Sequence, residues 1–385
     1  MRVIVLAPGL SPRIGGVGVF ERDLLPHLLP LIAGRGHEVL VLLSKDGFLA
    51  MMPEGVKAVH LPVRRDSSLL RIFYECVYSS ALSWQADVFL ALESRLPLSP
   101  IFAKRKIVFV HDIWAPQAAA GRWPILDGDL RLCYTWRAVA KAVNSATTIL
   151  TPSHSVADEV REFFHVPVSS LITVPEGVDH TRFKPVTDRQ ELVRLRKQYH
   201  LPEAFYLFVG NLGQRKNLEL LVRTYAVHAT EVGSGDIFLP VVVVGSDGES
   251  PGTNPTRALI EETHQTHNFR FLGYVPHDHL PGLYAAAKAL IHPAWHEGFG
   301  LPPLESMACG VPVVVSNRAS LPEVVGDAAL QIDPGQPESL AEALRSLNDE
   351  SIRGGLIARG LERAKTFSWE YTAQRIADQV LSGST

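Results

Sequence analysis

The chain has 385 residues, a length that suits two domains of ordinary size. Hydrophobic residues make up 46% and charged residues 20%, a composition typical of a packed globular protein. The formal net charge is −3 and the only notable basic run, residues 104–106, is short, which argues against nucleic acid as the main partner.

The cysteines and the apolar runs indicate in which cellular compartment the protein is expected. Cys76, Cys133 and Cys309 form neither a disulfide framework nor a metal-ligand spacing, so we expect a reducing cytoplasm. The first seven residues begin as a strand rather than as a signal sequence. No uninterrupted apolar run approaches the roughly 20 residues that span a bilayer. A peripheral position at the inner face of the membrane stays open.

Short apolar runs alternate with helical patterns along the whole chain. Continuous apolar runs predict parallel strands buried on both faces, and the helices between them predict βαβ crossovers. The predicted strands are Val3–Leu6, Glu38–Leu43, Val88–Ala91, Ile107–Val110 and Thr148–Thr151 in a first series, and Tyr206–Val209, Pro240–Val244, Phe269–Leu272, Ala289–His292 and Val311–Val315 in a second. Two series predict an α/β protein with two Rossmann-like, doubly wound domains.

A glycine-rich run at 15–21 follows the first strand and opens a helix. Gly15 and Gly16 would allow the backbone to approach an anion closely. A dinucleotide fingerprint would need a third glycine where Glu21 stands, and an acidic residue at the end of the second strand. NAD binding is therefore disfavoured, and a plain tight turn stays open.

The segment Arg64–Trp84 mixes arginines with large apolar residues. This pattern fits a helix lying on a membrane surface. It fits equally a helix that packs on a sheet, which is the interpretation that we favour.

His111 and Asp112 follow the fourth predicted strand. A histidine at the carboxyl end of a parallel strand points into the ligand crevice, although taken alone it is more often structural. The one Asp-x-Asp pair, Asp127 and Asp129, lies in an irregular stretch and is interpreted as a surface loop, so no essential metal is expected.

The domain boundary is predicted inside residues 174–185, a segment with one glycine and two prolines. The N-terminal domain then covers 1–182 and the C-terminal domain 183–366. The last segment, 367–385, reads as an amphipathic helix.

A second glycine turn, at 210–217, ends the first strand of the second series and begins a helix. Arg215 and Lys216 are adjacent there and can neutralise a diphosphate. Helix N-termini disfavour cations, so two of them at this place indicate a bound anion.

Residues 296–305 carry the most information. Glu297 and Glu305 flank a glycine-rich turn and the pair Pro302 and Pro303, which fit a first helical turn. Glu305 is expected within that turn and Glu297 on the loop before it. Backbone N–H groups at the helix start would suit phosphates, and the carboxylates would suit sugar hydroxyls.

In these residues the chain resembles the large retaining glycosyltransferase family usually numbered four, which has the GT-B fold with a deep interdomain cleft. The resemblance extends over both halves: the histidine–aspartate pair at 111, the crossing at 176–179, the turn at 210–217 and the whole segment 294–323. In the family, the C-terminal helix returns to the first domain. Many relatives have arginine where Asn211 stands, and Arg215 would supply the missing charge.

The resemblance implies roles for these residues. Glu305 would bind ribose hydroxyls, Glu297 would lie near the donor hexose, and His111 would lie beside the donor sugar. The implied catalytic residues are His111, Lys216, Arg215 and Glu297. The implied donor-binding residues are Gly15, Gly16, Gly210, Asn211, Arg215, Lys216, Tyr274, Val275, Glu297, Gly298, Phe299, Gly300, Leu301 and Glu305.

The sequence therefore predicts a metal-independent retaining glycosyltransferase that uses a nucleotide diphosphate sugar and a saccharide or lipid-linked saccharide acceptor. GDP-mannose is favoured because the two motifs resemble bacterial mannosyltransferases of polysaccharide assembly, while UDP-glucose and UDP-linked amino sugars stay open. The alternatives are another GT-B enzyme, such as an epimerase or a phosphorylase, and a non-catalytic sugar-nucleotide-binding protein. A paired-carboxylate hydrolase is disfavoured because it needs no cationic phosphate site.

Overall fold

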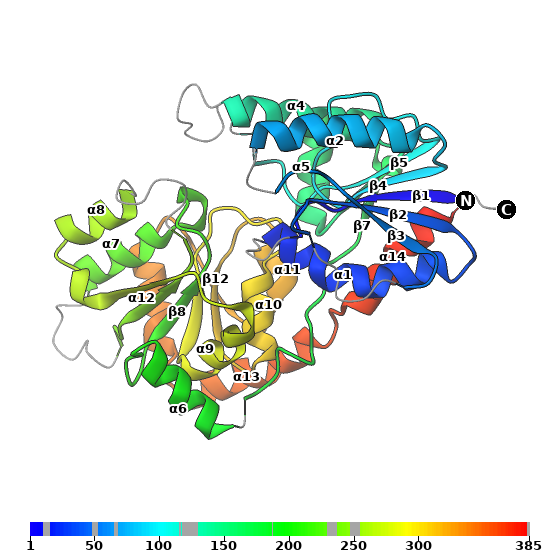
Figure 1. Cartoon of the computed structure of the whole chain (residues 1–385). Coiled ribbons are helices and arrows are strands. Elements are labelled where there is room, and N and C mark those ends of the chain that lie inside the picture. The colour runs from blue at the N-terminus through cyan, green and yellow to red at the C-terminus, as the bar shows by residue number, and fades with distance from the viewer. Residues whose placement is uncertain are drawn as a thin grey trace. The chain divides into compact units, whose positions relative to one another are not determined.

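The computed structural model describes residues 1–10, 16–47, 53–64, 68–114, 117, 130–186, 188–228, 237–246 and 255–382. The chain divides into two compact units (Figure 1). The N-terminal domain comprises Met1–Gly177 with Ser368–Thr385, and the C-terminal domain comprises Val178–Phe367. The division falls earlier than the predicted boundary after residue 182, because Val178 and Phe183 are buried in the core of the C-terminal domain.

The described part of the N-terminal domain contains one seven-stranded sheet in which every pair is parallel. Its strand order is β3-β2-β1-β4-β5-β6-β7. The strands are β1 (Arg2–Leu6), β2 (Glu38–Leu43), β3 (Val56–His60), β4 (Val88–Ala91), β5 (Arg105–Phe109), β6 (Thr148–Thr151) and β7 (Leu171–Thr173). Helices α1 (Gly16–Ala33), α2 (Ser68–Ser83), α4 (Leu130–Ser145) and α5 (His154–Phe164) connect them, with the short turn η1 (Val168–Ser170) before β7.

The C-terminal helix α14 (Trp369–Leu381) packs against α1 in this same domain (Figure 1). The ring of Trp369 meets Phe20 of α1 at 5.7 Å between centroids. Arg105 at the start of β5 donates to the carbonyls of Gln379 and Val380 in the last turn of α14, where a helix leaves its carbonyls without intrahelical partners. A Cβ on Gly177 would lie 2.3 Å from Trp369 N, so a larger residue there would displace the returning chain.

The described part of the C-terminal domain contains a six-stranded parallel sheet with the order β10-β9-β8-β11-β12-β13. Its strands are β8 (Tyr206–Val209), β9 (Val241–Val244), β10 (Phe269–Gly273), β11 (Ala289–His292), β12 (Val313–Ser316) and β13 (Leu330–Ile332). The helical elements are α6 (Arg189–Gln198), η2 (Gln214–Lys216), α7 (Leu218–His228), α8 (Pro255–Glu262), η4 (Thr266–Asn268), η5 (His277–His279), α9 (Leu280–Ala286), α10 (Leu301–Ala308), α11 (Leu321–Val325), α12 (Pro337–Ser346) and α13 (Glu350–Ala364).

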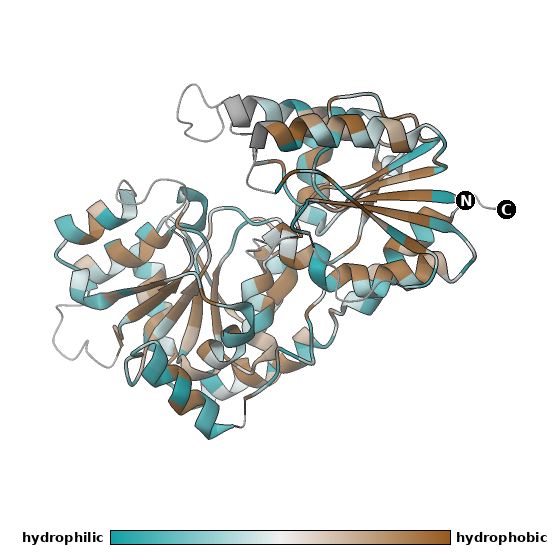
Figure 2. Ribbon diagram, in the orientation of Figure 1, coloured by the Kyte–Doolittle hydropathy of each residue, from teal (hydrophilic) through white to brown (hydrophobic). Residues whose placement is uncertain are grey.

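Two hydrophobic clusters cover the two faces of this second sheet. Successive residues of a strand point to opposite faces, so Leu207 and Leu290 enter the cluster with α9, α10 and α11, while Tyr206 and Ile291 enter the cluster with α7 and α12. Figure 2 shows the resulting hydrophobic strands beneath helices of mixed polarity. Both predicted Rossmann-like, doubly wound sheets are confirmed, and the expected interdomain cleft stays a prediction.

Two further findings bear on the predictions. Strand β5 ends at Phe109 and β12 begins at Val313, so the predicted strands there are displaced by a residue or two. Among the described residues, no helix combines the length and the apolar character needed to cross a membrane.

Candidate active site

The order of the second sheet reverses at its middle. The chain moves outward from β8 to β9 and β10, and then returns to place β11 on the other side of β8. In open α/β sheets, ligands bind outside the carboxyl ends of the two strands at such a reversal. Here these strands lead into residues 210–217 and 293–300, the two segments that the sequence singled out.

Glycines allow the ends of β8 and β9 to approach closely. Gly210 and Gly245 have φ angles of 153° and 147°, which disfavour any residue with a Cβ. A Cβ on Gly245 would lie 1.9 Å from the Gly210 carbonyl oxygen. Asn211, directly after Gly210, accepts a hydrogen bond through its Oδ1 from the Oγ of Ser246, directly after Gly245, at 3.1 Å. The exposed Asn211 therefore lies beside the end of β9.

Hydrogen bonds tie the loop after β8 to the loop after β11. Asn217 has a left-handed conformation with φ 55°, and its Nδ2 donates to the carbonyls of Pro293 and Pro334 at 3.1 and 2.9 Å. The backbone N–H of Trp295 donates to the carbonyl of Arg215 at 2.9 Å. These bonds hold Lys216, the last residue of η2, beside Glu297.

Glu297 is 7% exposed and has cationic and neutral donors around it. Its Oε1 accepts from Lys216 Nζ, and His292 Nε2 lies 2.8 Å away. Burial by itself would raise the pKa of Glu297, but Lys216, His292 and Arg215 together hold that pKa well below its usual range. Glu297 is therefore an ionised carboxylate at neutral pH.

His292, the last residue of β11, is the neutral partner of Glu297. Burial lowers its pKa, and the nearby charges of Lys216 and Arg215 lower it further against the opposing effect of Glu297. A neutral His292 beside an ionised Glu297 carries its hydrogen on Nε2 and donates it. Ser320 Oγ fixes the same loop by donating to the carbonyls of Glu297 and Phe299, both at 2.8 Å.

Glu305 lies deeper in α10 than the sequence predicted. Gly300, with φ 113°, precedes the helix, and Glu305 is its fifth residue rather than part of the first turn. The prediction was wrong because the helix begins at Leu301, before the two prolines. Glu305 is 5% exposed, and its Oε2 accepts from the hydroxyl of Tyr284 at 2.8 Å. Burial and Glu305 itself raise the pKa of Tyr284 well above its usual value, so this hydroxyl keeps its proton and donates.

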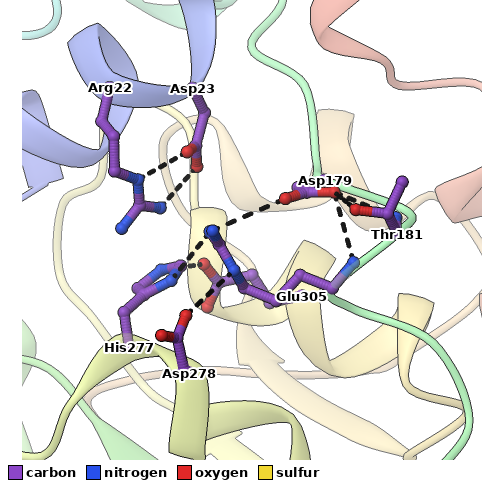
Figure 3. Close-up of polar contacts among 8 residues, drawn as sticks. Arg22, Asp23, Asp179, Thr181, His277, Asp278 and Glu305 are labelled. Atoms are coloured by element: carbon purple, nitrogen blue, oxygen red, sulfur yellow. Dashed lines mark hydrogen bonds and ion pairs between the residues drawn. The ribbon is translucent and has the colours of Figure 1, made fainter. Parts of the chain in front are cut away.

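A second group approaches Glu305 from η5. His277 Nε2 lies 3.5 Å from Glu305 Oε1, and Arg182 Nη1 donates to His277 Nδ1 at 3.2 Å. Since Nδ1 accepts, Nε2 carries the hydrogen that faces Glu305. Arg182 also lies 3.4 Å from Asp278 and 3.7 Å from Asp179. Figure 3 labels His277, Glu305, Asp278 and Asp179 among these side chains.

Sequence reasoning missed Tyr284, His277 and Arg182. The signal that was available for His277 is the polar triplet at 277–279, shortly after Tyr274 and Val275, which were among the implied donor-binding residues. Tyr284 lies in an apolar helical stretch, and nothing in the pattern distinguishes it from a core residue.

The other predicted donor-binding residues of this domain lie at the same edge of the sheet or in the core. Tyr274, after β10, is 55% exposed, and Val275 is buried. Gly298 is buried in the loop, and Leu301 opens α10. Phe299 is buried and its ring meets Phe367 at 5.6 Å, so its side chain belongs to the core.

The predicted residues of the N-terminal domain follow β1 and β5. Gly15 lies outside the described residues, as do Asp127 and Asp129. Gly16 is the first residue of α1. His111 is held within its own domain: Nε2 lies 2.8 Å from the carbonyl of Leu92, and Nδ1 lies 3.1 Å from Glu176 Oε1.

Both partners of the His111 ring are acceptors, so the ring satisfies both only as an imidazolium. Burial by itself would lower the pKa of His111, but the hydrogen bond and charge of Glu176, with the Leu92 carbonyl, raise it. The protonated form of His111 is thus favoured in the N-terminal domain.

The C-terminal site combines two buried carboxylates with two adjacent cations at the reversal of a parallel sheet. Carboxylates of this kind accept hydrogen bonds from sugar hydroxyls, and Lys216 with Arg215 attracts phosphate oxygens. Among the described residues, no group of three His, Cys, Asp or Glu side chains is placed to hold a metal ion.

Two family models match the chain. Residues 14–182 match the model described as glycosyltransferase family 4, and residues 194–360 match the model described as glycosyl transferases group 1. Since the two matches take in most of both sheets and all the residues of the candidate site in the C-terminal domain, the chain belongs to glycosyltransferase family 4, with the GT-B fold.

Individual relatives agree with this assignment. The chain is 37% identical over 241 residues to the O-antigen chain mannosyltransferase B of Escherichia coli, and the match covers 62% of each protein. The chain thus spans less than two thirds of that relative's length.

Solved structures show the same fold. Sucrose-phosphate synthase from Thermosynechococcus elongatus superposes with a TM-score of 0.75 at 19% identity, covering 100% of both chains. HepE from Anabaena, solved in complex with UDP-glucose, gives a TM-score of 0.73 at 18% identity and covers 99% of this chain and 100% of its own.

Proposed function

We propose that this protein is a retaining glycosyltransferase that moves mannose from GDP-mannose to the hydroxyl of a saccharide or lipid-linked saccharide. The observation that carries the proposal is the Lys216–Glu297 ion pair at the reversal of the C-terminal sheet, on the loop that leads into α10 and Glu305. The 37% identical relative is named a mannosyltransferase, which supports mannose, and HepE in complex with UDP-glucose supports a nucleotide sugar.

In the proposed reaction, departure of the nucleoside diphosphate builds negative charge on its leaving oxygen. Lys216 and Arg215 supply positive charge to stabilise it, in a partly buried place where such charge counts for more than in water. Glu297 orients Lys216 and stays ionised because of it, so it can accept a hydrogen bond from a hydroxyl of the donor hexose. Glu305, supported by Tyr284 and His277, accepts from the ribose hydroxyls.

The remaining parts of the proposal concern stereochemistry, metal and location. The acceptor hydroxyl attacks from the face that the diphosphate leaves, and the leaving phosphate takes its proton. Donor-binding roles for Gly15, Gly16, Gly210, Asn211, Tyr274, Val275, Gly298, Phe299, Gly300 and Leu301, and a catalytic role for His111, belong to the proposal. So do metal independence and a cytoplasmic location at the inner face of the membrane.

Ligand-induced thermal stabilisation tests the donor. GDP-mannose should raise the unfolding temperature more than UDP-glucose or a UDP-linked amino sugar at equal concentration, because a ligand stabilises in proportion to its affinity for the folded state. Stabilisation by UDP sugars alone would overturn the choice of donor. GDP-mannose should raise the unfolding temperature of Glu305→Gln less than that of the unaltered chain, which would show that the ligand binds at this site.

Turnover tests the reaction. Release of GDP from GDP-mannose should depend on an added acceptor saccharide, whereas an epimerase needs no acceptor and a phosphorylase needs phosphate. EDTA should leave the rate unchanged. Complete loss that magnesium restores would overturn metal independence.

A further inference from the structure

Helix α2 is apolar on two of its faces, and only one of them is covered. Tyr74, Tyr78 and Leu82, spaced four residues apart, pack against the core of the N-terminal domain, which confirms the favoured interpretation for that face. A second series at spacings of three, four and seven forms another face of the same helix. Its members are Leu70, Phe73, Val77 and, just past the helix end, Trp84, which are 59%, 59%, 47% and 69% exposed.

The connection after β4 extends this exposed apolar face. Phe102 is 49% exposed and its ring meets Trp84 at 4.9 Å, and Leu98 is 42% exposed. Four hydrogen bonds fasten this connection to α2 and α4: Ser80 Oγ to the Pro100 carbonyl, Phe102 N to Ser83 Oγ, Ser99 Oγ to the Cys76 carbonyl, and Lys141 Nζ to the Pro97 carbonyl. The apolar side chains are thus presented from a fixed backbone.

We call Leu70, Phe73, Val77, Trp84, Leu98 and Phe102 the α2 stripe. Helix α2 has 16 residues, so the stripe runs along about 24 Å. Large exposed apolar side chains that gather in one place mark a contact with a partner or a membrane. Figure 2 shows hydrophobic residues along α2.

The charges around the stripe are predominantly positive. Residues 68–109 and 130–145 carry eight Lys or Arg and three Asp or Glu, in a chain whose formal net charge is −3. All three acidic residues contact cations: Glu75 is fully buried against Arg95, Glu93 lies 2.6 Å from Arg95, and Asp87 lies 2.7 Å from Lys104. Three of the eight cations, Arg71, Arg95 and Lys104, contact these carboxylates, so the excess positive charge belongs to the other five, among them Lys106, Arg137 and Lys141.

We propose that the α2 stripe docks onto the surface of an anionic lipid bilayer. Its aromatic and aliphatic side chains would enter the boundary between headgroups and acyl chains, where tryptophan is favoured, and the surrounding basic residues would attract anionic headgroups. A second copy of the chain fits less well, because pairing two stripes would bring two basic rims together. This inference deepens the membrane part of the proposed function and involves no residue of the C-terminal site.

Co-sedimentation of the full chain with vesicles tests the proposal. We expect binding to mixed phosphatidylglycerol–phosphatidylcholine vesicles to be at least about tenfold stronger than to phosphatidylcholine alone, and to weaken as salt is added. Phe73→Ser with Trp84→Ser should weaken that binding at least about tenfold, because less apolar area is buried. The matched control is Val193→Ser with Val227→Ser, two exposed apolar residues of the C-terminal domain, 66% and 56% exposed, which should bind as the unaltered chain does.

A second variant covers the case in which the serine variant does not fold. Lys106→Gln with Arg137→Gln leaves the stripe and the Lys104–Asp87 pair intact and should reduce both the binding and its dependence on salt. Equal binding by the serine variant and the unaltered chain would overturn the proposal, as would indifference of the unaltered chain to vesicles.

Two measurements distinguish membrane docking by the α2 stripe from self-association and from the choice of donor. Size-exclusion chromatography with light scattering should give one mass for the unaltered chain and the serine variant. A dimer that the variant breaks would assign the stripe to self-association instead. Stabilisation by GDP-mannose should be the same in both proteins, so a wrong donor and a wrong docking surface give different results.

Discussion

Two histidines, one partly buried in the N-terminal domain and one fully buried in the C-terminal domain, lie after parallel strands and contact a glutamate, yet their pKa values shift in opposite directions. His111 follows β5 and meets Glu176 at 3.1 Å, and its pKa is raised. His292 ends β11 and meets Glu297 at 2.8 Å, and its pKa is lowered. The protonated form is favoured at His111 and disfavoured at His292.

The neighbours of each pair explain the difference. Burial lowers the pKa of both rings, so the remaining charges decide the outcome. At His111, only burial lowers the pKa. Glu176, Asp112 and a backbone carbonyl all raise it, because they stabilise the protonated ring. At His292, Lys216 and Arg215 already neutralise Glu297 and oppose a further positive charge. The C-terminal site thus keeps its histidine neutral beside two cations.

The largest expected effect comes from breaking the Lys216–Glu297 pair. Lys216→Ala should lower kcat by on the order of a hundredfold or more, the cost of losing a donor to developing charge. The same change should raise the pKa of His292, measured by NMR titration, and leave that of His111 unchanged. Lys288→Ala, which removes a lysine bound to Asn348 in the same domain, is the control. Normal turnover in Lys216→Ala would remove this lysine from the mechanism.

Breaking the His111–Glu176 pair in the N-terminal domain should lower stability. Glu176→Gln should cost about 1–3 kcal/mol of unfolding free energy at pH 6, the range for a hydrogen bond to a charged group, and lower the pKa of His111. Denaturant unfolding measures the first and NMR titration the second. Glu370→Gln alters an exposed glutamate 3.6 Å from His27 and should cost little. If Glu176→Gln and Glu370→Gln lost the same unfolding free energy, burial of the Glu176 contact would not strengthen it.

The second carboxylate of the C-terminal site, Glu305, depends on neutral donors instead of on cations. Tyr284→Phe should raise KM for the donor about fivefold with little change in kcat, since a hydrogen bond of about 1 kcal/mol is lost. Tyr225→Phe removes a buried hydroxyl that donates to Leu239 away from the site, and should leave KM unchanged. A fall in kcat alone would place Tyr284 in the chemical step.

The smallest effect is the dependence of stability on pH, and its sign differs between the histidines. A raised pKa means that His111 stabilises the fold below the unfolded value of about 6.5, and that this contribution is lost as pH rises through the folded pKa. A lowered pKa means that the unfolded state takes up a proton at His292 first, so stability falls as pH drops below about 6.5. The unfolding temperature should be measured against pH for both variants. In His111→Gln it should no longer fall as pH rises, and in His292→Gln it should no longer fall as pH drops below about 6.5. Identical profiles would refute the comparison.

The interior strands could be predicted from the sequence, whereas several edge strands could not. β2, β4, β6, β8 and β11 lie where the apolar runs placed them, because strands buried on both faces are continuously hydrophobic. The missed strands β3, β7 and β13 lie at sheet edges and have few buried residues, so their patterns resemble loops.

The same limit applies to the site. Local sequence placed Glu297, Glu305 and Lys216 near the ends of strands or at helix starts. It gave no indication that Tyr284 and His277 contact Glu305, because those contacts join segments whose spacing in the chain carries no pattern. The α2 stripe shows the converse: the apolar residues were visible, but which of them are covered was not.

The sequence by itself determined two parallel sheets, the family and the charged residues at the sheet reversal, because buried strands and glycine turns leave a local imprint. Only the tertiary structure decided that Lys216 pairs with Glu297, which histidine carries a proton, and which face of α2 stays exposed. Those outcomes depend on desolvation and on charges brought together from distant parts of the chain, and both arise only when the chain folds.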